Sequence, residues 1–177
     1  LQRYEDTCRM VEAQQRLEVL NKLASLVNAK LDLNSRLQVA VEVLNESLRL
    51  DRVAMFSVSP GEDELALVAF HDNQGSETKF KGKFPLACTR FEKCILNGGP
   101  FYTPDSERLT TDSDQARSLT EHGLRSDVLG PVILDGKALG ALAVSRAQAD
   151  AFHRDEIEFL ERVADHLSIA VRNGQLY

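Results

Sequence analysis

The stretch from Val128 to Arg146 constrains the fold of this chain more than any other. Two short apolar segments flank Asp135-Gly136, a dipeptide that readily supplies the two positive φ angles of a tight β-hairpin turn. Both segments consist mainly of β-branched and small residues, so we expect the hairpin to lie inside a sheet with both faces covered. Gly140 falls within the second segment, where a missing side chain indicates a bulge or a close approach by another element.

The residues after the hairpin complete a recognisable pattern. Phe152 to Glu156 begin a long amphipathic run that continues to Leu176. The hairpin pattern P-V-I-L-D-G-K-x-L-G-x-L-x-V, the following Phe-x-x-Asp-Glu and a helix ending Ala-Val-x-Asn-x-x-Leu-Tyr closely resemble the C-terminal half of a GAF domain. The resemblance implies an α+β fold. In that fold a central antiparallel sheet carries the terminal helices on one face, and short helices and loops form a possible pocket on the other.

The N-terminal region predicts one long helix over residues 1–31. Its apolar residues alternate three and four apart, which is the spacing of a heptad seam: Met10, Ala13, Leu17, Leu20, Ala24, Val27 and Leu31. Helix-capping residues at 32–35 mark a break, and a second amphipathic helix follows to Leu48. We therefore divide the chain into an N-terminal signalling helix (1–31), a core (32–152) and a C-terminal helix (153–177) leading toward an output domain outside this chain.

The core begins with two strands expected at 51–58 and 64–70, joined by a turn at Pro60-Gly61. A short third strand is expected at 79–84, and Thr89 to Glu92 have the form of a capping box that starts a helix. Another short strand is expected at 101–105 and another helix at 110–122. Short helices and long polar loops between strands often carry a binding site.

The last helix has its own start signal, with His153 as N-cap and Phe152 and Ile157 as a hydrophobic staple. The family more often has Ser or Thr at that cap. Downstream, Ile157, Leu160, Ala164, Leu167 and Val171 keep heptad spacing. Matching seams in both terminal helices predict a parallel homodimer in which these helices pair as a bundle.

Composition and charge exclude several classes of function. A net charge of −6 argues against a nucleic-acid surface. No apolar stretch reaches the roughly 18 residues of a membrane span, so we expect no direct membrane contact. Three cysteines without metal-type spacing fit a reducing compartment, which favours a cytoplasmic location for what we interpret as a fragment of a longer protein.

Three kinds of chemistry known in the family receive little support from the residues. Some GAF proteins resemble thiol-dependent methionine sulfoxide reductases, but Cys88 and Cys94 lack the cysteine-rich pattern of those enzymes. In phytochrome-type GAF domains a His commonly follows the bilin-attaching Cys, whereas Thr89 and Ile95 follow here. The phosphodiesterase-type signature has Asn-Lys ahead of Phe-x-x-x-Asp-Glu, whereas this chain has Ser145-Arg146 and one spacer residue fewer.

Metal sites and phosphate loops also lack the necessary patterns. No His, Cys or carboxylate cluster has ligand spacing, and Gly98-Gly99 is followed by a proline that cannot donate a backbone N–H to a phosphate. No kinase, cyclase or protease motif is present, so we assign no catalytic residue to this chain.

What remains is the general ligand pocket that the resemblance places between the sheet and residues 86–126. The candidate lining residues are Phe56, Phe91, Leu119, Arg125, Ser126 and Val128. We expect a cytoplasmic sensor module of a bacterial signalling protein, a histidine kinase, whose ligand or cofactor the sequence leaves unknown. A nucleotide cyclase or transcription-activator output, a ligand-free dimerisation spacer and a thiol-dependent reductase are the alternatives.

Overall fold

The hairpin lies in the middle of a six-stranded antiparallel sheet, as its composition predicts. The computed structural model describes residues 1–59, 61, 63–75, 82–109 and 114–175. Its sheet has the strand order β3-β2-β1-β6-β5-β4. The strands are β1 (Arg52–Val58), β2 (Glu64–Asp72), β3 (Lys83–Pro85), β4 (Phe101–Thr103), β5 (Ser126–Leu134) and β6 (Lys137–Arg146).

Two local features shape this hairpin. Asp135 and Gly136 both have positive φ, 52° and 75°, and join Leu134 directly to its partner Lys137. At Gly140, β6 approaches β1 so closely that a Cβ would collide with the carbonyl oxygen of Phe56. The β5–β6 register shifts just beyond the pair formed by Val132 and Gly140. Gly140 therefore combines the close approach and the irregularity that its position in a strand indicated.

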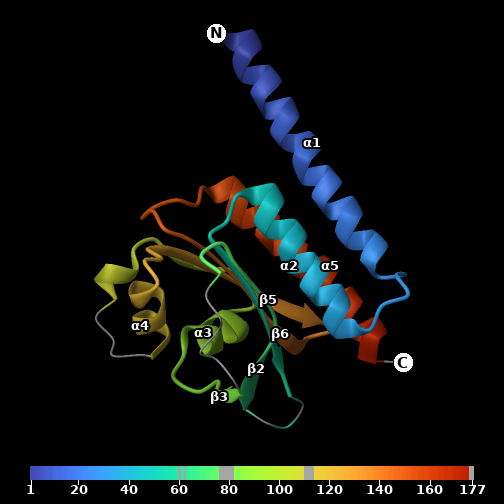
Figure 1. The fold of residues 1–177 in the computed structure, drawn as a ribbon, viewed down its shortest axis with the longest axis vertical. Coiled ribbons are helices and arrows are strands. Elements are labelled where there is room, and N and C mark those ends of the chain that lie inside the picture. The colour runs from blue at the N-terminus through green and yellow to red at the C-terminus, as the bar shows by residue number, and fades with distance from the viewer. Residues whose placement is uncertain (60, 62, 76–81, 110–113, 176–177) are drawn as a thin grey trace.

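Helices cover both faces of the sheet in separate layers (Figure 1). α2 and α5 pack directly on one face, α3 packs on the other beside β5, and α4 lies on that second side next to the turn η1. α1 forms an outer layer on α2 and α5, and its N-terminal half projects beyond the body of the molecule. The helices are α1 (Gln2–Leu26), α2 (Leu33–Leu48), α3 (Arg90–Asn97), α4 (Asp114–Glu121) and α5 (Arg154–Gln175), with η1 (Ser106–Arg108) as a 3₁₀ turn.

The N-terminal helix is shorter than expected and uses another face for its own domain. It ends at Leu26 rather than residue 31. Val19 and Leu23 are the residues that it buries, whereas Met10 and Leu17 of the heptad seam are 73% and 59% exposed. The residues of α1 that are buried against α2 and α5, Val19 and Leu23, are therefore not members of the heptad seam.

The heptad stripe of α5 lies against the sheet. Leu160, Ala164, Leu167 and Val171 are all buried in one hydrophobic cluster that includes Val128 and Val144. This stripe is therefore part of the chain's own core, and it is not available to pair with a second copy.

Caps at three helix starts match their sequence signals. The Asp32 side chain accepts from Ser35 N at 3.0 Å, and the Thr89 hydroxyl accepts from Glu92 N at 3.2 Å. At α5, the carbonyl of His153 accepts from Ile157 N, and Phe152 is buried. The expected strand at 79–84 is seen from Lys83, and the expected helix at 110–122 from Asp114. Pro60, residues 79–81 and residues 110–113 lie outside the described residues.

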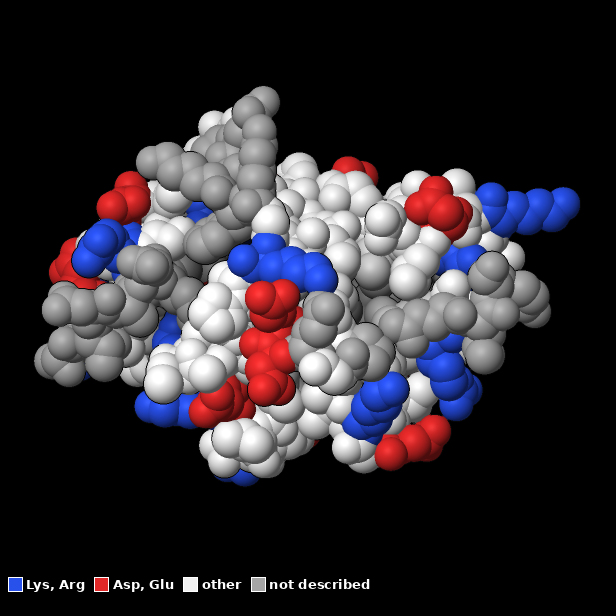
Figure 2. All heavy atoms as spheres, turned by 90° about the horizontal axis from the view of Figure 1, so that it is seen from below, with Lys and Arg blue, Asp and Glu red and all other residues white. Residues whose placement is uncertain are grey.

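Charged side chains are mixed on the face that Figure 2 shows. Lys and Arg lie among Asp and Glu there, and they do not gather into one basic area. This distribution agrees with the negative net charge of the chain.

Candidate functional site

A small cavity lies between the sheet and the helices α3 and α4, on the side of the sheet away from α2 and α5. Its volume is about 50 Å³. Because side chains alternate between the faces of a strand, the even-numbered residues Arg52, Ala54 and Phe56 of β1 face the cavity. The described residues that line it are Arg52, Ala54, Phe56, Leu67, Phe70, Phe84, Arg90, Phe91, Ser118, Leu119, Asp127, Leu129, Ala143 and Ser145.

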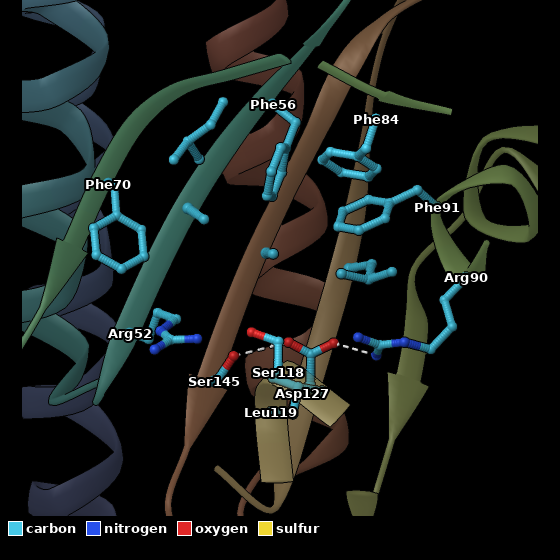
Figure 3. Close-up of a pocket in the computed structure, with 14 residues that line it drawn as sticks. Arg52, Phe56, Phe70, Phe84, Arg90, Phe91, Ser118, Leu119, Asp127 and Ser145 are labelled. Atoms are coloured by element: carbon cyan, nitrogen blue, oxygen red, sulfur yellow. Dashed lines mark hydrogen bonds and ion pairs between the residues drawn. The ribbon is translucent and has the colours of Figure 1, made fainter. Parts of the chain in front are cut away.

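One end of the cavity is aromatic. The rings of Phe56, Phe84 and Phe91 contact one another, with centroids 4.9 to 6.0 Å apart (Figure 3). Edge-to-face arrangements of this kind stabilise a cluster beyond the area that its rings bury. The three rings come from β1, β3 and α3, so they join the sheet to the short helix above it.

The other end of the cavity is lined by Arg52, Asp127 and Ser145, which belong to a row of polar residues that crosses five strands at one level. The backbone register pairs Asp72 with Arg52, Arg52 with Ser145, Ser145 with Asp127, and Asp127 with Thr103. All five side chains are largely or completely buried, with Asp127 only 1% exposed. Burying polar side chains lowers the stability of the fold unless they form hydrogen bonds or ion pairs, so the contacts of each member matter.

Two ion pairs satisfy most of this row. Arg52 holds Asp72 through Nε and Nη2 at 2.9 and 2.8 Å. Arg90 reaches down from α3, and its Nη1 donates to Asp127 at 2.6 Å and to Thr103 at 3.1 Å. The Ser145 hydroxyl donates to the second Asp127 oxygen at 2.8 Å. Figure 3 shows Arg90 and Ser145 converging on Asp127 from opposite sides.

The structure brings together three of the six residues expected to line a pocket. Phe56, Phe91 and Leu119 line the cavity. Val128 is buried on the opposite face of the sheet, in the cluster beneath α5. The Ser126 hydroxyl donates to the carbonyl of Gln148. Arg125 lies outside the cavity lining as well.

Arg125 instead holds the start of η1. Its Nη2 and Nε donate to Asp105 at 2.8 and 3.3 Å. The hydrogen bonds from Arg125 hold the pKa of Asp105 below its usual value, and Asp105 raises the pKa of Arg125 in return.

The sequence analysis missed Arg52, Arg90, Asp127 and Ser145, which form the polar end. A one-residue offset in a strand moves a side chain to the other face, which is why Asp127 lines the cavity while Ser126 and Val128 do not. A usable signal was present. Arg52 and Asp127 are charged residues inside otherwise apolar strands, and a charge in such a position is rarely buried without a partner.

The two cysteines of the core differ in environment. Cys94 is fully buried, its thiol lies 3.4 Å from the carbonyl oxygen of Gly99, and burial raises its pKa to about 12. Such a thiol is not a nucleophile at neutral pH. Cys88 is exposed in the loop before α3 and has a positive φ of 63°.

Comparison with known families decides the identity of the fold. The family model described as "GAF domain" matches residues 32–171, which is most of the chain. The chain belongs to the GAF domain family. Its match begins at the cap of α2 and ends within α5, so it contains the whole sheet and both short helices over the cavity.

One curated relative of this GAF domain is the circadian input-output histidine kinase CikA of Thermosynechococcus vestitus. The two are 22% identical over an alignment 187 residues long. The alignment includes 97% of this chain. The chain spans about a quarter of that relative, 25% of its length.

Solved structures share the fold at low identity. A GAF domain from a phosphoenolpyruvate-protein phosphotransferase of Coxiella burnetii is 22% identical with a TM-score of 0.79, covering 93% of this chain and 96% of that one. The substrate complex of free methionine-R-sulfoxide reductase from Neisseria meningitidis is 22% identical with a TM-score of 0.75, covering 91% and 90%. A phycoerythrobilin-bound GAF domain from a cyanobacterial phytochrome is 17% identical with a TM-score of 0.75, covering 91% and 96%.

The described parts of this GAF domain contain no cluster of three or more His, Cys, Asp or Glu side chains arranged to hold a metal ion. Among the described helices, none combines the length and the apolar character needed to cross a membrane.

Proposed function

We propose that this chain is a non-catalytic, cytoplasmic GAF sensor domain. A small molecule bound in the cavity between the sheet and α3 and α4 regulates an attached signalling output, a histidine kinase. The observation that carries the proposal is the buried polar row at one end of that cavity, because two of its members, Ser145 and Asp72, are adjacent in sequence to residues that anchor α2 and α5. The relationship to a histidine kinase supports the choice of output.

The first link between the cavity and the helices is at the end of β6. Ser145 faces the cavity, whereas the next residue, Arg146, faces the helices. Arg146 Nη2 donates to the carbonyl of Leu48 at the end of α2 at 2.8 Å and to Glu156 in the first turn of α5 at 2.7 Å. Its guanidinium also lies over the ring of Phe152, 4.5 Å from the centroid.

The end of strand β2, which is separated from β6 by β1, repeats this arrangement. Asp72 belongs to the polar row, and Asn73 follows it. The Asn73 amide donates to the carbonyl of Leu50 at 2.8 Å, and its oxygen accepts from Asn45 of α2 at 2.7 Å. A ligand that shifts the polar row would therefore shift the anchors of α2 and α5 in the same movement.

Dimerisation is the second part of the proposal, and we assign it to α1. Four large apolar side chains of this helix are at least half exposed: Tyr4, Met10, Val11 and Leu17. Met10 and Leu17 are one heptad apart, and so are Tyr4 and Val11. A second copy in parallel orientation would cover this stripe, since identical helices side by side present the same spacing. The α5 half of the expected bundle is used by the core, so α1 carries the homodimer contact.

The test is a fusion of this chain, through α5, to the dimerisation and catalytic segments of a histidine kinase. Replacing Ala143 by Phe fills the cavity, because Ala143 lines it from β6. We expect Ala143→Phe to change autophosphorylation at least threefold, while Lys93→Gln on the exposed side of α3 leaves it unchanged. Equal activity of all three folded fusions would contradict the sensor function.

The cavity's size favours a second candidate function, a ligand-free dimerisation spacer. A volume of about 50 Å³ is well below that of pockets for drug-sized ligands, roughly 300 Å³ or more. In a spacer, charge at Leu17 (Leu17→Glu) would abolish dimers and filling the cavity would leave the output unchanged. A thiol-dependent reductase is the less favoured alternative, because its fold relative is an enzyme but Cys94 is buried with a raised pKa.

A further inference from the structure

The polar end of the cavity leaves specific hydrogen-bond donors without partners. Arg52 is 7% exposed, and its Nη1 makes no hydrogen bond to a described residue, although Nε and Nη2 hold Asp72. The Nε of Arg90 is buried and has no partner within the described part of the chain. Both oxygens of Asp127 are already engaged. The open groups are therefore donors, so the missing partner is an acceptor.

Two features make a carboxylate the best acceptor. Each guanidinium has five N–H donors in a planar fork, so it can hold its aspartate and a second carboxylate at the same time. A charge-assisted bond from a guanidinium group to a carboxylate is stronger than one to a neutral carbonyl. A ligand cation would instead leave the open Arg donors unmet and add positive charge beside them.

The remaining walls limit the rest of the molecule. Beyond the polar row the cavity is lined by the apolar side chains of Ala143 and Leu129 and by the ring of Phe91, which belongs to the aromatic cluster. A cavity of about 50 Å³ holds only about three to five heavy atoms, since one water-sized group needs roughly 10–15 Å³ of such volume. The occupant thus has a short apolar part next to its acceptor.

We propose that the cavity binds a short-chain monocarboxylate of about two or three carbons. Its carboxylate accepts from Arg52 beside Ser145, and its alkyl end points toward Phe91. This inference rests on the proposed sensor function, because it names the ligand class of the same cavity.

The test is an NMR titration of the ¹⁵N-labelled chain with acetate, propionate and butyrate, following the arginine Nε–Hε signals. We expect saturable binding that shifts the signals of Arg52 and Arg90, with propionamide and propylammonium at least tenfold weaker than propionate. Nitrate serves as a compact anion without an alkyl end, and we expect it also to bind more weakly. Equal binding of propionamide, tighter binding of nitrate, or linear shifts without saturation would each overturn the proposal.

Two variants are chosen to weaken ligand binding without unfolding the protein. Arg52→Gln with Asp72→Asn removes the guanidinium without leaving a buried unpaired carboxylate, and Ala143→Leu narrows the cavity while every polar group is retained. Both should weaken propionate binding at least tenfold, whereas Arg154→Gln on the exposed face of α5 should not change it. Unchanged affinity in folded Ala143→Leu would place the bound anion outside the cavity and refute the proposal.

The two proposals fail separately. If propionate does not bind but Ala143→Phe alters the kinase fusion, the sensor function stands and the carboxylate assignment falls. If propionate binds at the arginines and the fusion ignores both propionate and Ala143→Phe, the ligand class stands and the sensor function falls.

Discussion

Ser145 and Arg146 are consecutive residues of β6 that contact opposite layers of the molecule. The Ser145 hydroxyl donates to Asp127 on the cavity side at 2.8 Å, whereas Arg146 donates to Glu156 of α5 at 2.7 Å on the helix side. The alternation of a β-strand makes this arrangement possible within one peptide unit. One peptide bond therefore links the cavity to the contacts at the end of α2 and the start of α5.

The contacts of Arg146 predict a clear effect on stability. Arg146→Gln removes an ion pair whose partners are only 17% and 21% exposed, and it weakens the bonds to the Leu48 and Ala151 carbonyls. We expect the free energy of unfolding to fall by about 2–4 kcal/mol, because Glu156 is left partly buried and unpaired. Urea denaturation followed by circular dichroism measures the change.

Arg154→Gln is the matched control. Arg154 and Glu158 form an ion pair on α5, and their side chains are 91% and 56% exposed. Its effect should stay within about 0.5 kcal/mol. Equal losses in the two variants would show that burial of the Arg146 pair is not what matters.

The Arg90–Asp127 pair predicts strong coupling between α3 and β5. Asp127→Asn leaves the Arg90 guanidinium buried without a counter-charge, and we expect it to cost about 3 kcal/mol. Adding Arg90→Met should then cost much less than Arg90→Met alone, giving a coupling energy of about 2 kcal/mol in a double-mutant cycle.

A parallel cycle on the exposed pair Arg172–Asp135 provides the reference, and there we expect coupling of less than about 0.5 kcal/mol. Additive effects at Arg90 and Asp127 would mean that the two side chains do not interact in solution.

Gly140 and Gly130 offer a matched pair of strand glycines. A Cβ at Gly140 collides with the Phe56 carbonyl, whereas one at Gly130 meets the Ala164 side chain at 3.6 Å and the Leu160 carbonyl oxygen at 3.9 Å, both ordinary contacts. We expect Gly140→Ala to lower the free energy of unfolding by about 3 kcal/mol or more, because backbone must move, and Gly130→Ala to change it by less than about 1 kcal/mol. Thermal melts of both variants would test this, and similar melting temperatures would argue against the close approach.

The buried Cys94 thiol should react slowly with thiol reagents, and it should make the free energy of unfolding depend on pH in the alkaline range. With its pKa raised to about 12 by burial, Cys94 should resist a disulfide reagent at pH 8 that modifies the exposed Cys8 and Cys88 quickly. In the unfolded chain the pKa of this thiol is near its ordinary value of 9.0. The stability from the neutral thiol is therefore complete below pH 9 and is lost as pH rises toward 12, by up to about 1.4 kcal/mol per pH unit.

Comparing wild type with Cys94→Ala from pH 8 to 10.5 isolates this contribution from other alkaline effects. Above pH 9 the free energy of unfolding of the wild type should fall relative to that of Cys94→Ala. Rapid modification of Cys94 in the native protein, or a difference that does not vary with pH, would contradict the assignment.

Local signals were enough to predict much of the fold. Asp135-Gly136 predicts a turn whatever surrounds it, because its positive φ angles are set by the two residues themselves. The caps at Asp32 and Thr89 are likewise formed within four residues. The order of helices and strands, the interior place of the hairpin and the GAF family were all predicted from such patterns.

The tertiary structure decided the use of each apolar stripe and the composition of the cavity. Heptad spacing in α1 and α5 is the same in sequence, yet the sheet buries Leu160 and Leu167 while Met10 remains exposed. Spacing records which residues share a face, but the partner of that face is set by distant elements. Asp127 and Arg90 are 37 residues apart and meet only because α3 returns over the sheet. The sequence by itself thus determined the elements and their family, and long-range packing alone determined which charges meet in the cavity.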